Sequence, residues 1–296
     1  METGRPSETA RLAAVMRAAH RLLDHPPWIF EDGFAAPLAG IDDEATLRAS
    51  VSAFREELTR RFSSDCAHAL MRHIRADVTL RARYVEDELE KAMQRGVAQY
   101  VILGSGLDSF AYRRPDLVGK LHIFEVDHPA TQARKQARLR ELGTALPAHV
   151  TFVPVDFERQ SMRERLCESG YREDVPAFFS WLGVTWYLTE DAIVATLKEV
   201  AHAASGSEIV LDCALPKSLL DQGQREILAM LGSLTATHGE PVRTEFQPVR
   251  MVALLREVGF SQVQDLGAHD INALYAKARI DGLRFPGLLH LLKATL

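Results

Sequence analysis

Apolar residues along this chain follow two spacings in alternation, and these predict alternating strands and helices. Short apolar runs, typical of buried parallel strands, occur at 100–103 and 121–126, and we expect further strands at 149–155, 176–182, 207–213 and 260–266. The segments between them favour helices, which we expect at 79–95, 129–142, 160–169, 190–204 and 248–258. This alternation predicts an α/β protein with a doubly wound, mainly parallel sheet.

The chain before this alternation has a helical pattern. Residues 8–23 are amphipathic, and residues 44–76 are helical but weakly patterned. We therefore expect one domain in which a helical cap over 1–78 precedes an α/β core over 79–296. A longer mixed segment, 216–247, interrupts the core and is a candidate lid, because insertions of that length are often functional.

A glycine turn follows the first strand. Gly104-Ser105-Gly106 comes directly after the apolar run at 100–103, and glycine lets the backbone approach a ligand that a Cβ atom would hold away. The next apolar run ends in Asp127, 23 positions after Gly104. A strand, a glycine turn, a crossover and a strand-end acid together suit an adenosine ribose. The pattern predicts a nucleoside-cofactor site without choosing the cofactor.

Composition and charge argue against several classes of protein. The 296 residues carry a formal net charge of −5, which argues against a nucleic-acid partner. The three cysteines are far apart and odd in number, which argues against a disulfide framework or a zinc site. The N-terminus lacks an apolar signal core, and the longest uncharged stretch, 175–189, is too short to span a membrane. We expect a cytoplasmic protein with no metal and no membrane partner.

One arginine of the helix expected at 79–95 lies on its buried face. The apolar stripe of this helix consists of Val85, Leu89 and Met93. Arg81 is one turn before the stripe, whereas Arg83 aligns with Asp87 on the polar face. Arg81 is therefore expected to point inward, near the glycine turn.

NAD and S-adenosylmethionine compete as the nucleoside cofactor. NAD would place its pyrophosphate directly after the glycines, where Asp108 would repel it, and Ser109 replaces the third glycine of the dinucleotide fingerprint. S-adenosylmethionine has no phosphate, and its ammonium and sulfonium charges tolerate Asp108. Asp156, at the end of the third strand, could accept the adenine amino group. The charge argument favours S-adenosylmethionine.

Five motifs occur along the chain, in the order LRARYVEDEL (80–89), VILGSGLDSFAYR (101–113), FEVDHP (124–129), FVPVDFE (152–158) and WLGVTWYLTEDA (181–192). Together they resemble the leucine carboxyl methyltransferase family, especially its bacterial S-adenosylmethionine-dependent branch. The resemblance implies a Rossmann-like class I methyltransferase fold. It also implies six cofactor-binding residues, namely Arg81, Gly104, Gly106, Asp127, Asp156 and Phe157. The arginine would pair with the cofactor carboxylate, and the glycines would admit its methionine moiety and ribose. The first aspartate would bind the ribose hydroxyls, and the second, with its neighbouring phenylalanine, would hold the adenine.

The chain departs from the family at one position. Eukaryotic, protein-modifying members carry a glutamate after the fourth strand, where this chain has Leu182. One cofactor contact therefore differs from that of the eukaryotic members. The difference also weakens the inference that this chain shares their substrate, a protein C-terminal leucine.

We expect an O-methyltransferase whose acceptor is a carboxylate or phenol oxygen of a small molecule, for example a polyketide-like secondary metabolite. A carboxylate is ionised at neutral pH and needs no general base, whereas a phenol would benefit from one. His128 is the histidine nearest the cofactor motifs, and we expect it to cap or pack rather than to catalyse. Three alternatives stay open: a protein C-terminal carboxyl methyltransferase, a non-catalytic S-adenosylmethionine-binding protein and a dehydrogenase.

Overall fold

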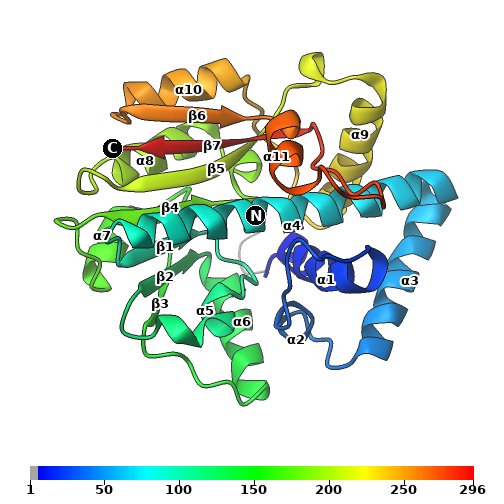
Figure 1. The fold of residues 1–296 in the computed structure, drawn as a ribbon, viewed down its shortest axis with the longest axis horizontal. Helices are drawn as coiled ribbons and strands as arrows, with labels where there is room; N and C mark the ends of the chain where they lie inside the picture. Colours follow the sequence, from blue (N-terminus) through cyan, green and yellow to red (C-terminus); the bar gives the residue numbers. More distant parts are fainter. Residues whose placement is uncertain (1–5) are drawn as a thin grey trace.

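The computed structural model describes residues 6–296, which form a seven-stranded sheet flanked by helices (Figure 1). The strand order is β3-β2-β1-β4-β5-β7-β6, and only β7 runs antiparallel to its neighbours. The strands are β1 (Gln99–Leu103), β2 (His122–Asp127), β3 (Val150–Pro154), β4 (Ala177–Trp181), β5 (Glu208–Ala214), β6 (Gln262–Leu266) and β7 (Leu289–Thr295). The predicted α/β fold with a mainly parallel sheet is confirmed.

Eleven α-helices surround this sheet within the described residues. They are α1 (Glu8–Leu23), α2 (Ala35–Leu38), α3 (Glu44–Arg61), α4 (Ser64–Gln94), α5 (Phe110–Arg113), α6 (Pro129–Glu141), α7 (Met162–Glu168), α8 (Glu190–Val200), α9 (Gln222–Thr237), α10 (Pro248–Glu257) and α11 (Ala268–Tyr275). Short 3-10 turns occur at η1 (Pro115–Leu117), η2 (Thr185–Tyr187) and η3 (Lys217–Leu219). Within this range, no helix combines the length and the apolar character needed to cross a membrane.

Two regions differ from the sequence prediction. The helix expected from residue 79 begins at Ser64 and is 31 residues long, so α4 passes through residue 78 without a break. The predicted end of the cap therefore falls inside a continuous helix. Beyond residue 266 the sequence predicted no element, yet α11 and β7 form there. β7 has no long apolar run of its own, and it is fixed by pairing with β5 and β6 on its two sides.

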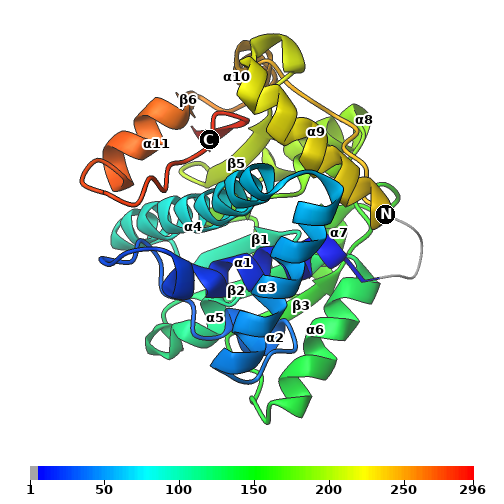
Figure 2. The same ribbon diagram turned by 90° about the vertical axis from the view of Figure 1, so that its right-hand side faces the viewer.

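Apolar side chains form one core on each face of the sheet. Along β1, Tyr100 and Ile102 enter the first core and Val101 and Leu103 the second, which is the period of two expected for a strand. The first core is covered mainly by α1, α3 and α4, which Figure 2 shows together on one side of the sheet. The second core packs against α7, α8 and α10.

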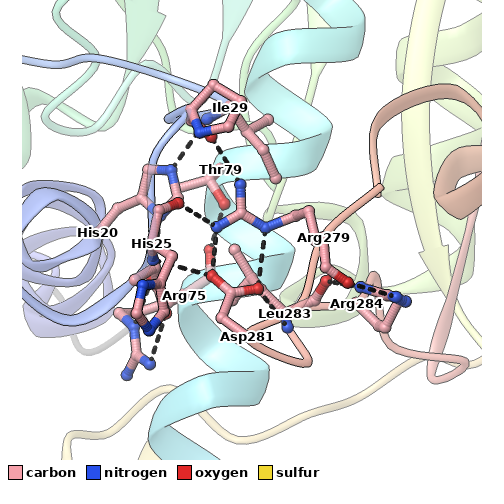
Figure 3. Close-up of polar contacts among 11 residues, drawn as sticks. His20, His25, Ile29, Arg75, Thr79, Arg279, Asp281, Leu283 and Arg284 are labelled. Carbon is pink, nitrogen blue, oxygen red and sulfur yellow. Dashed lines mark hydrogen bonds and ion pairs between the residues drawn. The ribbon is translucent and has the colours of Figure 1, made fainter. Parts of the chain in front are cut away.

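The chain between α11 and β7 fastens the C-terminal region to the end of α1 (Figure 3). The Arg279 guanidinium donates to the carbonyl oxygens of Pro27 and His25, both at 2.8 Å, and pairs with Asp281. The Asp281 carboxylate also accepts the backbone N–H of His25 at 3.0 Å. These contacts tie the last strand of the sheet to the N-terminal helices.

Candidate functional site

The six residues expected to hold a cofactor line one cavity: Arg81, Gly104, Gly106, Asp127, Asp156 and Phe157. The cavity has a volume of about 470 Å³ and lies beyond the carboxyl ends of β1 to β4. Helices α1, α4 and α9 supply the opposite walls. This is the usual place for a ligand in an open parallel sheet.

The glycine turn after β1 requires glycine for two reasons. Gly104 has φ +69°, and a Cβ atom there would collide with the Val184 side chain. Gly106 has φ +50°, and its Cβ atom would lie 3.1 Å from the Ala10 Cβ atom of α1. The N–H of Gly104 donates to the Val126 carbonyl at 2.8 Å, which fixes the turn to β2. The backbone of the glycine turn can therefore border the cavity directly, in space that side chains at these two positions would occupy.

Asp127 closes the turn from the end of β2. Its carboxylate accepts the N–H of Gly106, and the N–H of His128 at 2.6 Å. Burial raises the pKa of Asp127 to about 6, against the opposing effect of these donors. The His128 Nδ1 atom accepts the Ala130 N–H at 3.3 Å and caps α6, as the sequence predicted.

Asp156 and Phe157 occupy the cavity wall after β3. The Asp156 carboxylate accepts the Glu158 N–H at 3.1 Å, and its side chain is 25% exposed. The Phe157 ring packs against Trp181 with ring centroids 6.1 Å apart. An acceptor oxygen thus lies beside an aromatic face, a combination that suits a purine base.

Arg81 points inward from α4, as predicted, and is held by two carboxylates. Its Nη1 atom lies 2.9 Å from Asp77 Oδ2 and 3.1 Å from Asp212 Oδ2. Burial alone would lower the pKa of Arg81, but the two carboxylates raise it above its ordinary value. Both oxygens of Asp212 accept the Gly183 N–H at 2.9 Å. A Cβ atom at Gly183, where φ is +74°, would lie 2.7 Å from an Arg81 nitrogen, so the loop after β4 also needs glycine.

Sequence reasoning missed Asp77 and Asp212. Asp77 precedes Arg81 by one helical turn, but the predicted helix began after it. Asp212 is a fully buried carboxylate inside β5, within the apolar run predicted at 207–213. A buried acid in the middle of a largely apolar strand was the available signal, because such a group needs a partner.

The rest of the cavity is mainly apolar and is bounded by α1, α4, α9 and the start of β7. Its apolar lining includes Leu12, Ala13, Ile74, Val78, Trp186, Leu228, Leu231, Leu234, Leu288 and Leu289. His73 lies on the same wall, and burial lowers its pKa to about 4, so its imidazole is neutral at neutral pH. The sequence did not single out this histidine, because residues 44–76 were expected to be helical but weakly patterned, and the helix with a clear buried face was expected only from residue 79.

The candidate lid, 216–247, contributes a wall of the cavity. Half of it is α9, and the loop after α9 contacts α1 and the 3-10 turn η2 after β4. The Glu240 carboxylate accepts the Thr9 N–H at 3.0 Å, and the Arg243 N–H donates to the Trp186 carbonyl at 2.7 Å. The segment therefore covers the cavity in this structure.

Asp108 occupies the position that bears on the choice of cofactor. It lines the cavity, and its Oδ1 atom accepts the Phe110 N–H at 2.8 Å. The helix that follows, α5, has only four residues. A pyrophosphate here would face a carboxylate rather than the free N-terminus of a long helix, so the geometry disfavours NAD.

Comparisons with known proteins agree with this chemistry. Residues 10–201 match the family model described as leucine carboxyl methyltransferase. The chain is 32% identical over its full length, and over 99% of the relative, to the "Putative S-adenosyl-L-methionine-dependent methyltransferase YktD" of Bacillus subtilis. It is 31% identical to a protein of the same description from Mycolicibacterium gilvum, over 73% of this chain and 69% of that one.

Two crystal structures resemble the fold. A DUF574 family protein from Streptomyces avermitilis has a TM-score of 0.62 and covers 98% of this chain and 97% of its own. A "putative methyltransferase" from Thermobifida fusca has a TM-score of 0.58, with coverages of 99% and 96%. Both are 14% identical to this chain, so the likeness concerns the fold.

Proposed function

Because this chain belongs to the leucine carboxyl methyltransferase family, we propose that it methylates an oxygen atom of a small, largely apolar molecule. The protein is a methyltransferase, and its cofactor is S-adenosylmethionine. The oxygen acceptor and its small size are our proposal. The observation that carries it is the apolar wall formed by α1, α4 and α9, which encloses the cavity on the side away from the strand ends.

We place the cofactor along the strand ends, on the six residues named above. The turn from Gly104 to Gly106 leaves room for the ribose and the sulfur, and Asp127 offers acceptor oxygens to ribose hydroxyls. Asp156 and Phe157 suit the adenine, and Arg81 suits the carboxylate of the amino-acid part. The residues present fit the chemistry of each part of S-adenosylmethionine.

Catalysis by this chain is mainly orientation and exclusion of water. When bound, S-adenosylmethionine supplies a methyl group activated by its sulfonium. The apolar walls keep water away and align the acceptor oxygen with that methyl group. A carboxylate acceptor is already ionised and needs alignment alone. A phenol would pass its proton to a base, but His73, the imidazole on the apolar wall, has its pKa lowered to about 4 by burial and is a weak base, so the site favours a carboxylate acceptor.

The protein-acceptor alternative needs a groove that admits a peptide. Helices α1 and α9 bound the cavity here, and Thr9 of α1 donates its N–H to the Glu240 carboxylate in the loop after α9. Leu182 lines the cavity where the eukaryotic members carry glutamate. Both observations favour a small acceptor.

The proposal is tested with a panel of aromatic and aliphatic acids, phenols and a peptide that ends in leucine. We expect S-adenosylmethionine-dependent addition of one methyl group to an oxygen of an apolar small molecule, located by mass spectrometry and NMR. Methylation confined to the peptide, or to nitrogen or carbon atoms, would overturn it. Binding without transfer to the whole panel would support a non-catalytic role.

Two substitutions test the cofactor placement by calorimetry. Arg81→Ala and Asp127→Ala should each weaken binding of S-adenosylhomocysteine at least tenfold, or about 1.4 kcal/mol. Arg83→Ala is the matched control, because Arg83 pairs with Asp87 outside the cavity. Unchanged affinity in both test variants would show that the placement is wrong.

A further inference from the structure

The Arg81 cluster contains more negative than positive charge. We define this cluster as Asp77, Arg81 and Asp212, in which one guanidinium faces two buried carboxylates. The side chains of Asp77 and Arg81 are 14% and 11% exposed, and that of Asp212 is fully buried. With both acids ionised the cluster carries one net negative charge, which is costly away from water.

One oxygen of the cluster has no partner. Asp77 Oδ2 faces Arg81, but Oδ1 is buried and makes no hydrogen bond to any residue from 6 to 296. Both oxygens of Asp212 are used, because they accept the Gly183 N–H and one also faces Arg81. Asp77 is therefore the member of the cluster with unused capacity to accept hydrogen bonds.

The charge that the cluster lacks is one that the cofactor carries. The amino-acid part of S-adenosylmethionine has an ammonium beside the carboxylate that we assign to Arg81. The glutamate found in eukaryotic relatives is replaced by Leu182, which lines this cavity and cannot accept a hydrogen bond from its side chain. Asp77 also lines the cavity, one helical turn from Arg81.

We propose that Asp77 receives the α-ammonium of the cofactor and takes over the charge that Leu182 does not provide. The ammonium then neutralises the cluster, so that Arg81 and Asp77 recognise the two ends of one amino acid. The terminal torsion of an aspartate is soft, so a small rotation exchanges its two oxygens when the ligand arrives. This inference rests on the cofactor placement proposed above, and its test separates the two.

The test compares four ligands by calorimetry: S-adenosylhomocysteine, its analogue without the amino group, its analogue without the carboxylate, and methylthioadenosine, which lacks both. Asp77→Asn should weaken S-adenosylhomocysteine at least tenfold, and the carboxylate-free analogue by a similar factor. It should change the amino-free analogue and methylthioadenosine by less than twofold. Asp77→Glu, which keeps the charge, should retain more affinity for S-adenosylhomocysteine than Asp77→Asn does.

Asp87→Asn is the matched control, since Asp87 lies on the same helix and pairs with Arg83 away from the cavity. A large loss for the amino-free analogue with Asp77→Asn would overturn the inference, because Asp77 would then only orient Arg81. An equal loss for all four ligands would overturn it in favour of a structural role. Failure of the wild-type protein to bind S-adenosylhomocysteine would instead refute the cofactor placement. Methylthioadenosine binding also verifies that each variant is folded.

Discussion

Arg75 and Arg81 lie on the same helix, six residues apart, and pair with buried aspartates in opposite ways. Arg75 donates from two nitrogens to the two oxygens of Asp24, both at 3.0 Å. Asp24 also contacts His20 Nδ1 at 2.9 Å, and His20 Nε2 accepts the Ile29 N–H at 3.1 Å (Figure 3 shows His20, Ile29 and Arg75). We call this pair balanced, because one guanidinium faces one carboxylate. Burial alone would raise the pKa of Asp24, but His20 and Arg75 lower it below its ordinary value.

The Arg81 cluster is unbalanced. Burial raises the pKa of Asp77, and it raises that of Asp212 to about 7, although Arg81 opposes both changes. The balanced pair lies where α1 meets α4, whereas Asp77 and Arg81 of the unbalanced cluster line the cavity. Both groups are thus buried. They differ in whether each charge has an opposite charge as its partner. We interpret the complete pair as structural and propose that the cluster lacking a counter-charge belongs to a ligand site.

Breaking the balanced pair should give the largest effect. Arg75→Ala leaves Asp24 buried without its main partner, so we expect a loss of about 3–5 kcal/mol in the free energy of unfolding. Arg83→Ala, which removes a half-exposed arginine from the same helix, should cost less than about 1 kcal/mol. Denaturant unfolding measures both. A loss of similar size in the two variants would show that the Arg75 pair contributes no more than a surface pair.

Removing one negative charge from each group should change stability in opposite directions. Asp24→Asn leaves the buried Arg75 without its charged partner and should lower the free energy of unfolding by about 1–3 kcal/mol. Asp77→Asn leaves Arg81 and Asp212 in a one-to-one pair and should raise it by about 1 kcal/mol. Thermal unfolding without ligand measures the two shifts. A decrease with Asp77→Asn would contradict the view that this cluster is strained by excess negative charge.

The pH dependence of binding should give the smallest effect. Arg81, Asp77 and the Gly183 N–H face Asp212, and Tyr187 lies near Arg81. Because its pKa is raised to about 7, Asp212 is partly protonated at neutral pH, and an incoming ammonium favours the ionised form. Affinity for S-adenosylhomocysteine should therefore rise between pH 6 and pH 8, by up to about tenfold.

Methylthioadenosine, which has no ammonium, is the control for this titration. Its affinity should stay flat over most of that range and fall only toward pH 6, where Asp127 becomes protonated. Calorimetry in two buffers of different ionisation enthalpy would also detect the proton released by S-adenosylhomocysteine. Equal pH slopes for the two ligands would assign the titration to Asp127 alone.

The positions of the candidate site residues could be predicted from the sequence wherever local sequence pattern determines geometry. The carboxyl ends of parallel strands meet at one edge, so Gly104, Asp127 and Asp156 could be placed together from their positions after apolar runs. Arg81 could be placed because its helical face is set by the stripe that follows it. Periodicity and strand direction thus placed these residues near one another, whereas the cofactor-binding roles of the six, and the inclusion of Phe157, came from the resemblance to the family.

Elements that depend on distant partners were not predictable in the same way. β7 is recognisable as a strand only between β5 and β6. Asp77 and Asp212 are 135 positions apart in the chain and meet only when α4 packs beside β5. The apolar acceptor wall combines α1, α4 and α9, whose stripes look like ordinary core in the sequence.

The contact between Thr9 and Glu240 has a consequence for turnover. It joins the first turn of α1 to the loop after α9, two segments 231 positions apart that bound the cavity from different sides. Because both segments line the cavity, we expect spent cofactor and methylated product to leave only when the two segments separate. The rate at which they separate then sets a ceiling on the number of catalytic cycles per second, however fast the methyl group moves.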